Sequence, residues 1–412
     1  MAMRAALLDV TPLRMSPAFR RLWIGRTLSG FGGQMTLVAV MFQVWRMTGS
    51  TVWTGAAGLA QALPIIVFGL FAGTVVDHGD RRRIYLIAVT GQCVCSILLA
   101  VQGFFGHLPV SGVLVLVAVQ SSFVAVGGPA SRTFVPRLLP GAQLAAGLAL
   151  TQISFQAAML LGPALAGLLL GWTGVGGCYL IDAITFGLAF YGAFGLPPMR
   201  AEGEPPRPGL LGVADGLAFL VRDPVVRGAL LTDLAATVLA MPISLFPLIN
   251  TVRFGDNPRT LGLFLSAIAV GGLLASAFSG AFTRFSRPGL VMLSAAGVWG
   301  VALAAFGLAA DPWLGLAFLV LAGAADTVSV VSRGAIVQLA TPDALRGRVG
   351  AAEQIVGQAG PDVGNLRAGL VASATSGPAA LVGGGLLCVA AIVAIAATTP
   401  RVRRFATASG QG

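Results

Sequence analysis

Long apolar runs, each about the length of a membrane-spanning helix, dominate this sequence. A span needs about 20 consecutive apolar residues. Twelve runs meet this need, at roughly 22–45, 52–76, 84–105, 109–131, 144–170, 175–196, 226–250, 259–282, 289–309, 312–332, 347–372 and 378–399. Only 10% of the residues are charged, whereas a soluble domain carries about 25%. Because lipid offers no partner to an open backbone, we expect an all-α integral membrane protein.

The arginines indicate which side of the membrane each loop faces. The formal charge is +11, and the chain contains no lysine. With the N-terminus in the cytoplasm, nearly all loop arginines lie inside, and only Arg46, Arg253 and Arg259 lie outside. This asymmetry predicts that both termini are cytoplasmic. It also argues against nucleic-acid binding, because the arginines sit in short loops between apolar runs and share no surface.

A proline-rich, charged segment divides the chain into two halves of six spans. We expect an N-terminal bundle at 1–196, a cytoplasmic linker with an amphipathic helix at 197–225, and a C-terminal bundle at 226–412. The halves repeat: Ser131-Arg132 leads to Leu144 as Ser332-Arg333 leads to Leu345, at the same spacing. Parallel repeats of this kind are typical of transporters whose substrate lies between two bundles.

The motif GTVVDHGDRRR at 73–83 carries the first resemblance to a known family. It resembles the loop between spans two and three of the major facilitator superfamily, although His78 and Asp80 depart from that pattern. The resemblance implies a major facilitator fold with a charged conformational latch at the inner helix ends. The alternative is that the arginines only set topology. The predicted latch residues are Gly73, Asp77, Asp80, Arg81, Arg82, Arg132, Asp326, Arg333, Arg346, Arg348 and Glu353.

The C-terminal half indicates a branch within this superfamily. The segment from Asp326 to Arg333 and TPDALRGRV at 341–349 resemble the enterobactin-exporter branch, which includes macrolide-efflux-like members. Branch membership implies export and leaves the substrate open. In span five, GPALAG resembles the core of an antiporter motif. There Gly162, Pro163 and Gly167 are expected to bend the helix, since proline removes one helical hydrogen bond.

Ionisable groups inside the bilayer are candidates for coupling transport to protons. Asp233, Asp362, Asp182 and Arg367 lie within predicted spans. For each acid the alternative is structural, as an ion pair or a hydrogen bond to a neighbouring helix, and Arg367 is a candidate to neutralise Asp362. Polar candidates for the substrate cavity are Gln34, Gln61, Gln120, Gln152, Gln156 and Gln358.

Two departures from the exporter pattern concern the energy source. Gln34 follows Gly33 where related exporters often carry an acid, and span four has no arginine at mid-membrane. Spans six, seven and eleven must then supply any proton site.

Taken together, the residues predict a secondary active exporter of a siderophore or an amphipathic drug, with proton antiport. The alternatives are an uptake or facilitative transporter of the same fold and a non-transporting membrane sensor. No nucleotide-binding, metal or catalytic motif is present, so we expect neither an enzyme nor a cofactor. The expected setting is the bacterial inner membrane, as a multi-pass monomer whose partners are the bilayer, the substrate and protons.

Overall fold

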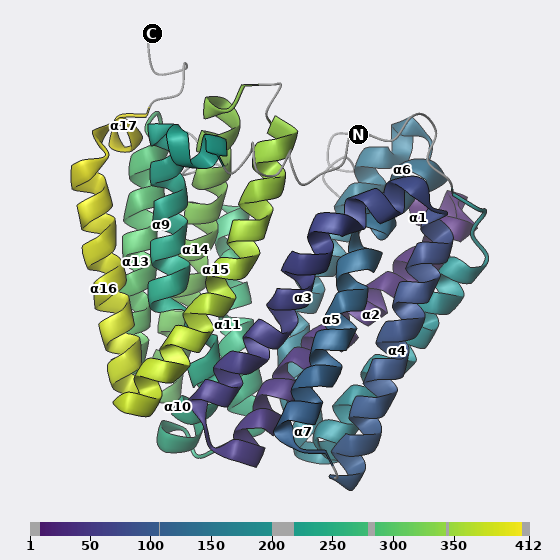
Figure 1. Ribbon diagram of the computed structural model, residues 1–412, viewed down its shortest axis with the longest axis horizontal. Coiled ribbons are helices and arrows are strands. Elements are labelled where there is room, and N and C mark those ends of the chain that lie inside the picture. The colour runs from purple at the N-terminus through teal and green to yellow at the C-terminus, as the bar shows by residue number, and fades with distance from the viewer. Residues whose placement is uncertain (1–8, 107, 200–217, 279–284, 343–345, 406–412) are drawn as a thin grey trace, which may run out of the picture. The chain divides into compact units, whose positions relative to one another are not determined.

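The computed structural model describes residues 9–106, 108–199, 218–278, 285–342 and 346–405, and every element in these ranges is helical (Figure 1). The chain divides into two compact units. Unit 1 contains residues 1–40 and 63–209, and unit 2 contains residues 41–62 and 210–412. The segment 41–62, which ends α2 and begins α3, therefore groups with the C-terminal helices. The linker predicted at 197–225 lies mostly outside the described residues; within the described part of it, residues 218–222 are helical.

The first half of the chain forms long helices joined by short turns. They are α1 (Thr11–Met15), α2 (Pro17–Thr48), α3 (Thr51–His78), α4 (Arg81–Phe105), α5 (Val110–Arg132), α6 (Phe134–Leu138) and α7 (Gly141–Phe194). Within α7 the backbone leaves helical geometry at Gly174, with φ 66° and ψ −168°. Positive φ is accessible to glycine because it lacks a Cβ. The break separates the spans predicted at 144–170 and 175–196.

The second half begins several of its helices with an acid or amide followed by proline. The helices are α9 (Pro224–Ala240), η2 (Ile243–Leu245), α10 (Phe246–Arg253), α11 (Pro258–Ala277), α13 (Pro288–Leu308), α14 (Pro312–Ala340), α15 (Arg346–Ala374), α16 (Gly377–Thr398) and α17 (Pro400–Arg403). Asp223, Asn257 and Asp311 each accept a backbone N–H from the first turn of the helix that follows. Proline then occupies the first helical position, where no N–H is needed.

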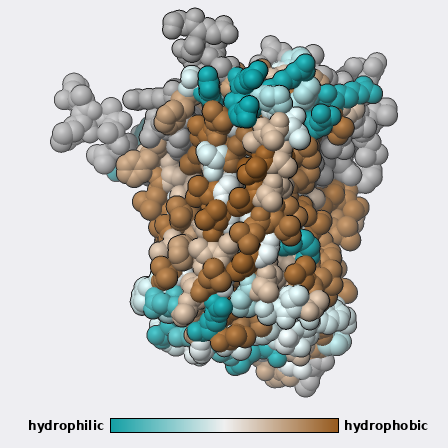
Figure 2. Space-filling view, turned by 90° about the vertical axis from the view of Figure 1, so that its left-hand side faces the viewer, coloured by the Kyte–Doolittle hydropathy of each residue, from teal (hydrophilic) through white to brown (hydrophobic). Residues whose placement is uncertain are grey.

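Nine helices among the described residues are long and apolar enough to cross a membrane. One of these is the stretch 146–194, which contains two predicted spans, and α2 and α15 coincide with two further predictions. The count of twelve and the side of the termini stay predictions. On the face of the C-terminal helices, hydrophobic residues cover the middle and hydrophilic residues gather at both ends (Figure 2). This banding is what a bilayer-embedded surface requires.

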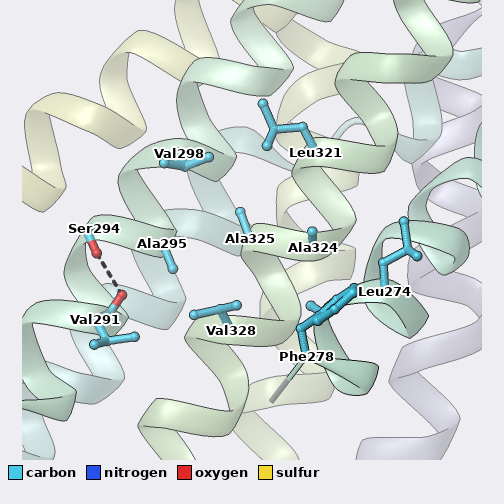
Figure 3. A pocket seen from close by; sticks show the side chains of 11 residues that line it. Leu274, Phe278, Val291, Ser294, Ala295, Val298, Leu321, Ala324, Ala325 and Val328 are labelled. Carbon is cyan, nitrogen blue, oxygen red and sulfur yellow. Dashed lines mark hydrogen bonds between the residues drawn. The ribbon is translucent and has the colours of Figure 1, made fainter. Parts of the chain in front are cut away.

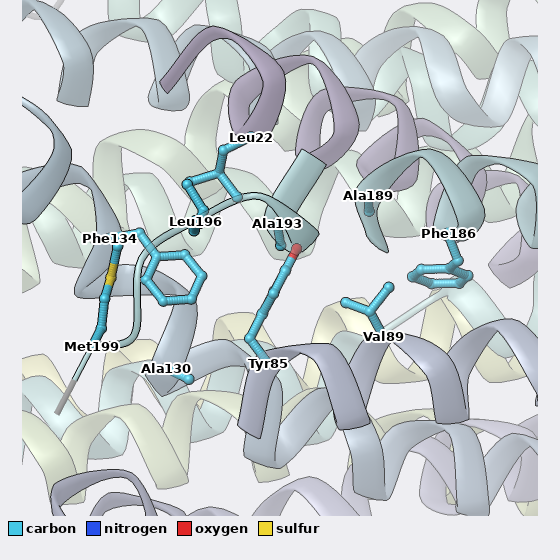
Figure 4. Close-up of a cluster of buried hydrophobic side chains, with 10 residues drawn as sticks. All are labelled: Leu22, Tyr85, Val89, Ala130, Phe134, Phe186, Ala189, Ala193, Leu196 and Met199. Atoms are coloured by element: carbon cyan, nitrogen blue, oxygen red, sulfur yellow. The ribbon is translucent and has the colours of Figure 1, made fainter. Parts of the chain in front are cut away.

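Each unit has its own buried core. In unit 1, side chains of α2, α4, α5, α6 and α7 meet around Tyr85 and Phe134 (Figure 4), whose rings are edge to face at 5.3 Å. In unit 2, Phe246, Phe264 and Phe306 form mutual ring contacts with centroids 5.3–5.8 Å apart. Since lipid is as apolar as these side chains, close packing and not water exclusion stabilises such cores.

Candidate functional site

A cluster of partly buried charges joins three helices of unit 2. Arg333 of α14 forms ion pairs with Asp233 of α9 and with Glu353 of α15, and its Nε lies 3.5 Å from Glu353 Oε1. Asp326 precedes Arg333 by two helical turns and lies within electrostatic range of Arg333 and Asp233. Two carboxylates thus pair with one guanidinium and a third lies within electrostatic range, so acids outnumber the base. The structure thus brings one predicted coupling residue, Asp233, together with three predicted latch residues, Asp326, Arg333 and Glu353.

Among the described residues, no three histidine, cysteine, aspartate or glutamate side chains converge as metal ligands. The cluster can instead hold a proton on one carboxylate while the guanidinium neutralises another. Such an arrangement is typical of proton-handling and conformational sites inside membranes.

Asp362 lies apart from this cluster, on the part of α15 that meets the start of α3. A Cβ placed on Gly58 would lie 2.9 Å from Asp362 Oδ1, so the carboxyl reaches the α3 backbone. None of the ion pairs among the described residues involves Asp362. Arg367 does not neutralise it, because its Nη2 donates to the carbonyl of Leu239 at 2.6 Å. The two side chains are five positions apart and leave the helix in different directions.

Small residues and hydrogen bonds hold α3, η2 and α15 together near Asp362. Thr51 Oγ1 donates to Gly369 O at 2.7 Å, and Thr54 Oγ1 donates to Ser244 O at 2.9 Å. Asn365 accepts from the backbone N–H and hydroxyl of Ser244 at 3.1 and 2.7 Å. We call this set of contacts the α3–α15 seam. Sequence reasoning missed Asn365 and Ser244, although the helix break at Met241-Pro242 signalled backbone groups in need of partners.

Asp182 of unit 1 accepts hydrogen bonds from three other helices. Its Oδ2 accepts from Thr36 at 2.8 Å, Ser96 at 2.7 Å and Gln120 at 3.4 Å, and Gln120 also donates to Ser96 at 2.8 Å. Asp182 is fully buried. It therefore links α2, α4, α5 and α7, which is the hydrogen-bonding role that the sequence left open. Gln120, a predicted cavity residue, is buried in this network.

The loop motif after α3 is part of unit 1 in the described residues. Asp80 Oδ1 accepts the backbone N–H of Arg82 at 3.0 Å and of Met199 at 3.1 Å, and Arg82 donates to the carbonyl of Phe194. Burial favours a higher pKa for the Asp80 carboxyl, but the hydrogen bonds from Met199 and Arg82 hold that pKa below its ordinary value. Asp80 thus caps α4 and ties it to Met199, in the segment that follows α7.

The remaining predicted residues fall at varied places. The side chains of Gly73, Asp77, Arg132, Arg346, Arg348 and Gln358 lie outside the part of the chain that the structure describes. On α7, Gly162 and Gly167 are buried, and a Cβ on Gly162 would press on Gln34. The helix continues through Pro163, and its non-helical residue is Gly174. Gln61 and Gln156 are partly exposed, and Gln152 is exposed.

Two helical units with buried polar and charged groups within long apolar helices define a polytopic membrane protein. Residues 9–410 match the family described as "Transmembrane secretion effector", and the chain belongs to this family of the major facilitator superfamily. The family consists of transporters, so the chain is a transporter and not an enzyme, and a multi-pass protein of the bacterial inner membrane.

Curated relatives and solved structures agree with this assignment. The enterobactin exporter EntS of Shigella boydii serotype 18 is 26% identical over 344 residues, which is 83% of this chain and 82% of that protein. EntS of Citrobacter koseri is 25% identical over the same shares. The nucleoside transporter NupG has a TM-score of 0.77 at 14% identity, covering 94% of this chain and 99% of that one. A bacterial homologue of ferroportin in the inward-facing state has a TM-score of 0.70 at 16% identity, covering 94% and 99%.

Proposed function

We propose that this protein exports a small organic molecule, a siderophore or an amphipathic drug, by alternating access in exchange for protons. Export and the siderophore class are inferred from the EntS relatives, which match 83% of the chain. The observation that supports proton coupling is the carboxyl of Asp362. It faces Gly58 in mid-helix and takes part in none of the ion pairs among the described residues.

The α3–α15 seam gives Asp362 a means to bias two conformations. A neutral carboxyl can remain packed against Gly58, whereas a carboxylate needs water or a cation, which tight packing excludes. Protonation therefore favours the closed seam and loss of the proton favours its opening. By the predicted topology the seam lies toward the outer ends of α3 and α15. A proton taken up from outside would close this end, and its release inside would prepare the protein for the next substrate.

Asp233 is the second candidate in this proposal. Its partner Arg333 also pairs with Glu353, so a proton arriving on Asp233 leaves the guanidinium to the other acid. This exchange of ion-pair partners changes the contacts between α9, α14 and α15, and Arg333 keeps a carboxylate partner throughout. The α3–α15 seam and the charged cluster would then both change their contacts on proton binding, at two different depths along the helices of unit 2.

Reconstitution into liposomes tests the proposal. Purified protein is placed in vesicles with an imposed pH gradient, and transport of enterobactin-type siderophores and amphipathic drugs is measured for wild type, Asp362→Asn and Asp233→Asn. We expect the pH gradient to accelerate wild-type substrate transport in the direction opposite to the proton flow. The acceleration in Asp362→Asn should be at least tenfold smaller. Asp311→Asn is the matched control, because Asp311 caps α14 in an exposed turn.

Each outcome selects between the alternatives. Transport that ignores the pH gradient would remove proton antiport and favour facilitated diffusion. Equal responses in wild type and both variants would move the proton site away from Asp362 and Asp233. Movement of the substrate in the same direction as the protons would indicate uptake. Substrate binding without transport would favour the sensor.

A further inference from the structure

An apolar groove of about 440 Å³ lies on unit 2 between α11, α13 and α14 (Figure 3). Its walls are Leu274 and Phe278 of α11 on one side and Val291 and Val298 of α13 on the other. Its floor is formed by the small side chains of α14, among them Ala325 (Figure 3). The groove is open along its length to the surroundings of the bundle, which in a spanning protein are lipid.

The chemistry of the lining excludes a polar ligand. Ser294 is the one lining residue with a side-chain polar atom, and its hydroxyl donates to Val291 O of its own helix at 3.0 Å (Figure 3). The lining therefore offers a ligand no free side-chain donor, and the hydroxyl oxygen of Ser294 is its single side-chain acceptor. A flexible hydrocarbon chain can fill such a site by dispersion contacts alone.

The groove is short enough to lie within one leaflet. Its α13 stripe runs from Val291 to Val298, which is about 10 Å of helix against the roughly 15 Å depth of one leaflet. The stripe begins three residues after Pro288, where α13 starts. By the arginine distribution this end of α13 is cytoplasmic, so the groove lies in the inner leaflet.

A positive charge stands at the mouth of the groove. Arg287 is the residue before α13, four positions ahead of Val291, the first α13 residue of the lining. Its side chain is exposed and it forms none of the ion pairs among the described residues. The first N–H groups of α13 add partial positive charge at the same place. An anion held here would continue directly into the apolar lining.

We propose that this groove is a binding site for an anionic phospholipid of the inner leaflet, with one acyl chain between α11 and α13 and its phosphate at Arg287. The charge at the mouth selects the headgroup, and the small residues of α14 make room for the chain. This site is separate from Asp362 and the charged cluster, and it does not depend on the proposed export.

Native mass spectrometry of the full chain in detergent tests the site. After delipidation, phosphatidylglycerol or phosphatidylcholine is added and the bound lipid is counted. We expect tighter binding of phosphatidylglycerol by wild type. Ala325→Phe, which fills the floor, should weaken that binding at least tenfold. Arg287→Gln should reduce the preference for phosphatidylglycerol over phosphatidylcholine about fivefold while the chain still binds.

Matched controls separate the site from general effects. Ala317→Phe places the same ring on an exposed position of α14 outside the groove, and Arg259→Gln removes an exposed arginine at the opposite end of α11. Both should bind phosphatidylglycerol as wild type does. If Ala325→Phe does not fold, the headgroup preference of Arg287→Gln still tests whether the site binds an anionic phospholipid. Unchanged preference in that variant, or displacement of the lipid by a transported substrate, would overturn the proposal.

Discussion

Asp80 illustrates how one residue replaces a family pattern with a local function. Asp80 departs from the loop pattern that residues 73–83 otherwise resemble, and here its carboxyl caps α4 and accepts the N–H of Met199. The backbone N–H of Arg81 also donates to Met199 O at 2.9 Å. A capping bond and two cross-links thus converge on two adjacent residues, which explains why an acid is accommodated here.

We expect Asp80→Ala to lower the free energy of unfolding by about 1–2 kcal/mol, the usual loss for a helix cap. Asp80→Asn, which can still cap, should lose less. The measurement is thermal unfolding in detergent followed by tryptophan fluorescence. Asp311→Ala is the control, because that cap bonds only Leu314 N in an exposed turn and should cost less.

The same cap gives a pH dependence whose sign follows from its lowered pKa. The folded carboxyl has a pKa below the ordinary value of 3.8. Its stabilising contribution is therefore complete above that value and is lost as the pH falls through the folded pKa. The stability difference between wild type and Asp80→Ala should be constant from pH 5 upward and shrink below pH 3.8. A difference that grows on acidification would contradict the assignment.

Two neighbouring glycines of α2 differ in their surroundings. A Cβ on Gly32 would lie 2.5 Å from Asp182 Oδ1 and would also strike Thr185, whereas nothing lies within 4 Å of one on Gly33. We expect Gly32→Ala to destabilise unit 1 by about 1–3 kcal/mol and Gly33→Ala to be neutral or stabilising. Equal melting temperatures for the two variants would show that α2 can move away from Asp182.

At the level of helices, α9 does not continue into α10 without interruption. Met241 and Pro242 end α9, and the 3₁₀ turn η2 follows before α10 begins. The interruption leaves the backbone N–H of Ser244 without a helical partner, and this N–H donates to the side chain of Asn365 of α15. The hydroxyl of Ser244 donates to the backbone carbonyl of the same residue. Irregular backbone inside a membrane persists only where protein groups supply such partners. The break therefore fixes α15, and with it Asp362, against the start of α3.

The ion pairs of Arg333 join α9, α14 and α15, and their loss should be costly. Arg333→Gln leaves two mostly buried acids, Asp233 and Glu353, without this partner, so we expect a loss of about 2–4 kcal/mol, partly recovered in the double variant Arg333→Gln/Asp233→Asn. Arg46→Gln is the control. Arg46 pairs with Asp256 at 2.8 Å but its side chain is 61% exposed, and its loss should cost less than about 1 kcal/mol. Similar losses for both would argue against a buried role for Arg333.

For the whole molecule, the pH gradient is the test of the proposed cycle. Protons entering from the outer side should close the α3–α15 seam and protons leaving inside should reset the protein, so reversing the gradient in liposomes should reverse its effect on siderophore efflux. Wild-type protein should show this reversal and Asp362→Asn should not. Acceleration by both signs of gradient would indicate an effect of pH on the substrate and not on the protein.

The sequence determined the helical, membrane-spanning class of this protein, because charge-free runs of about 20 residues leave the backbone no other solution in lipid. It also determined where helices begin, through pairs such as Asp223-Pro224 and Asp311-Pro312, since capping is a local interaction. The family resemblance given by residues 73–83 and 326–349 was confirmed by the match of residues 9–410.

Only the tertiary structure decided which buried polar groups meet. Arg333 pairs with Asp233 and Glu353, Arg367 turns to Leu239 O, and Asp362 faces Gly58. These partners lie on different helices, some more than a hundred residues apart, and small residues at the crossings set the register between them. Periodicity within one helix gives the face of a side chain but not the neighbour that this face meets. For that reason the sequence found the charged residues, and the packing of the helices chose their partners.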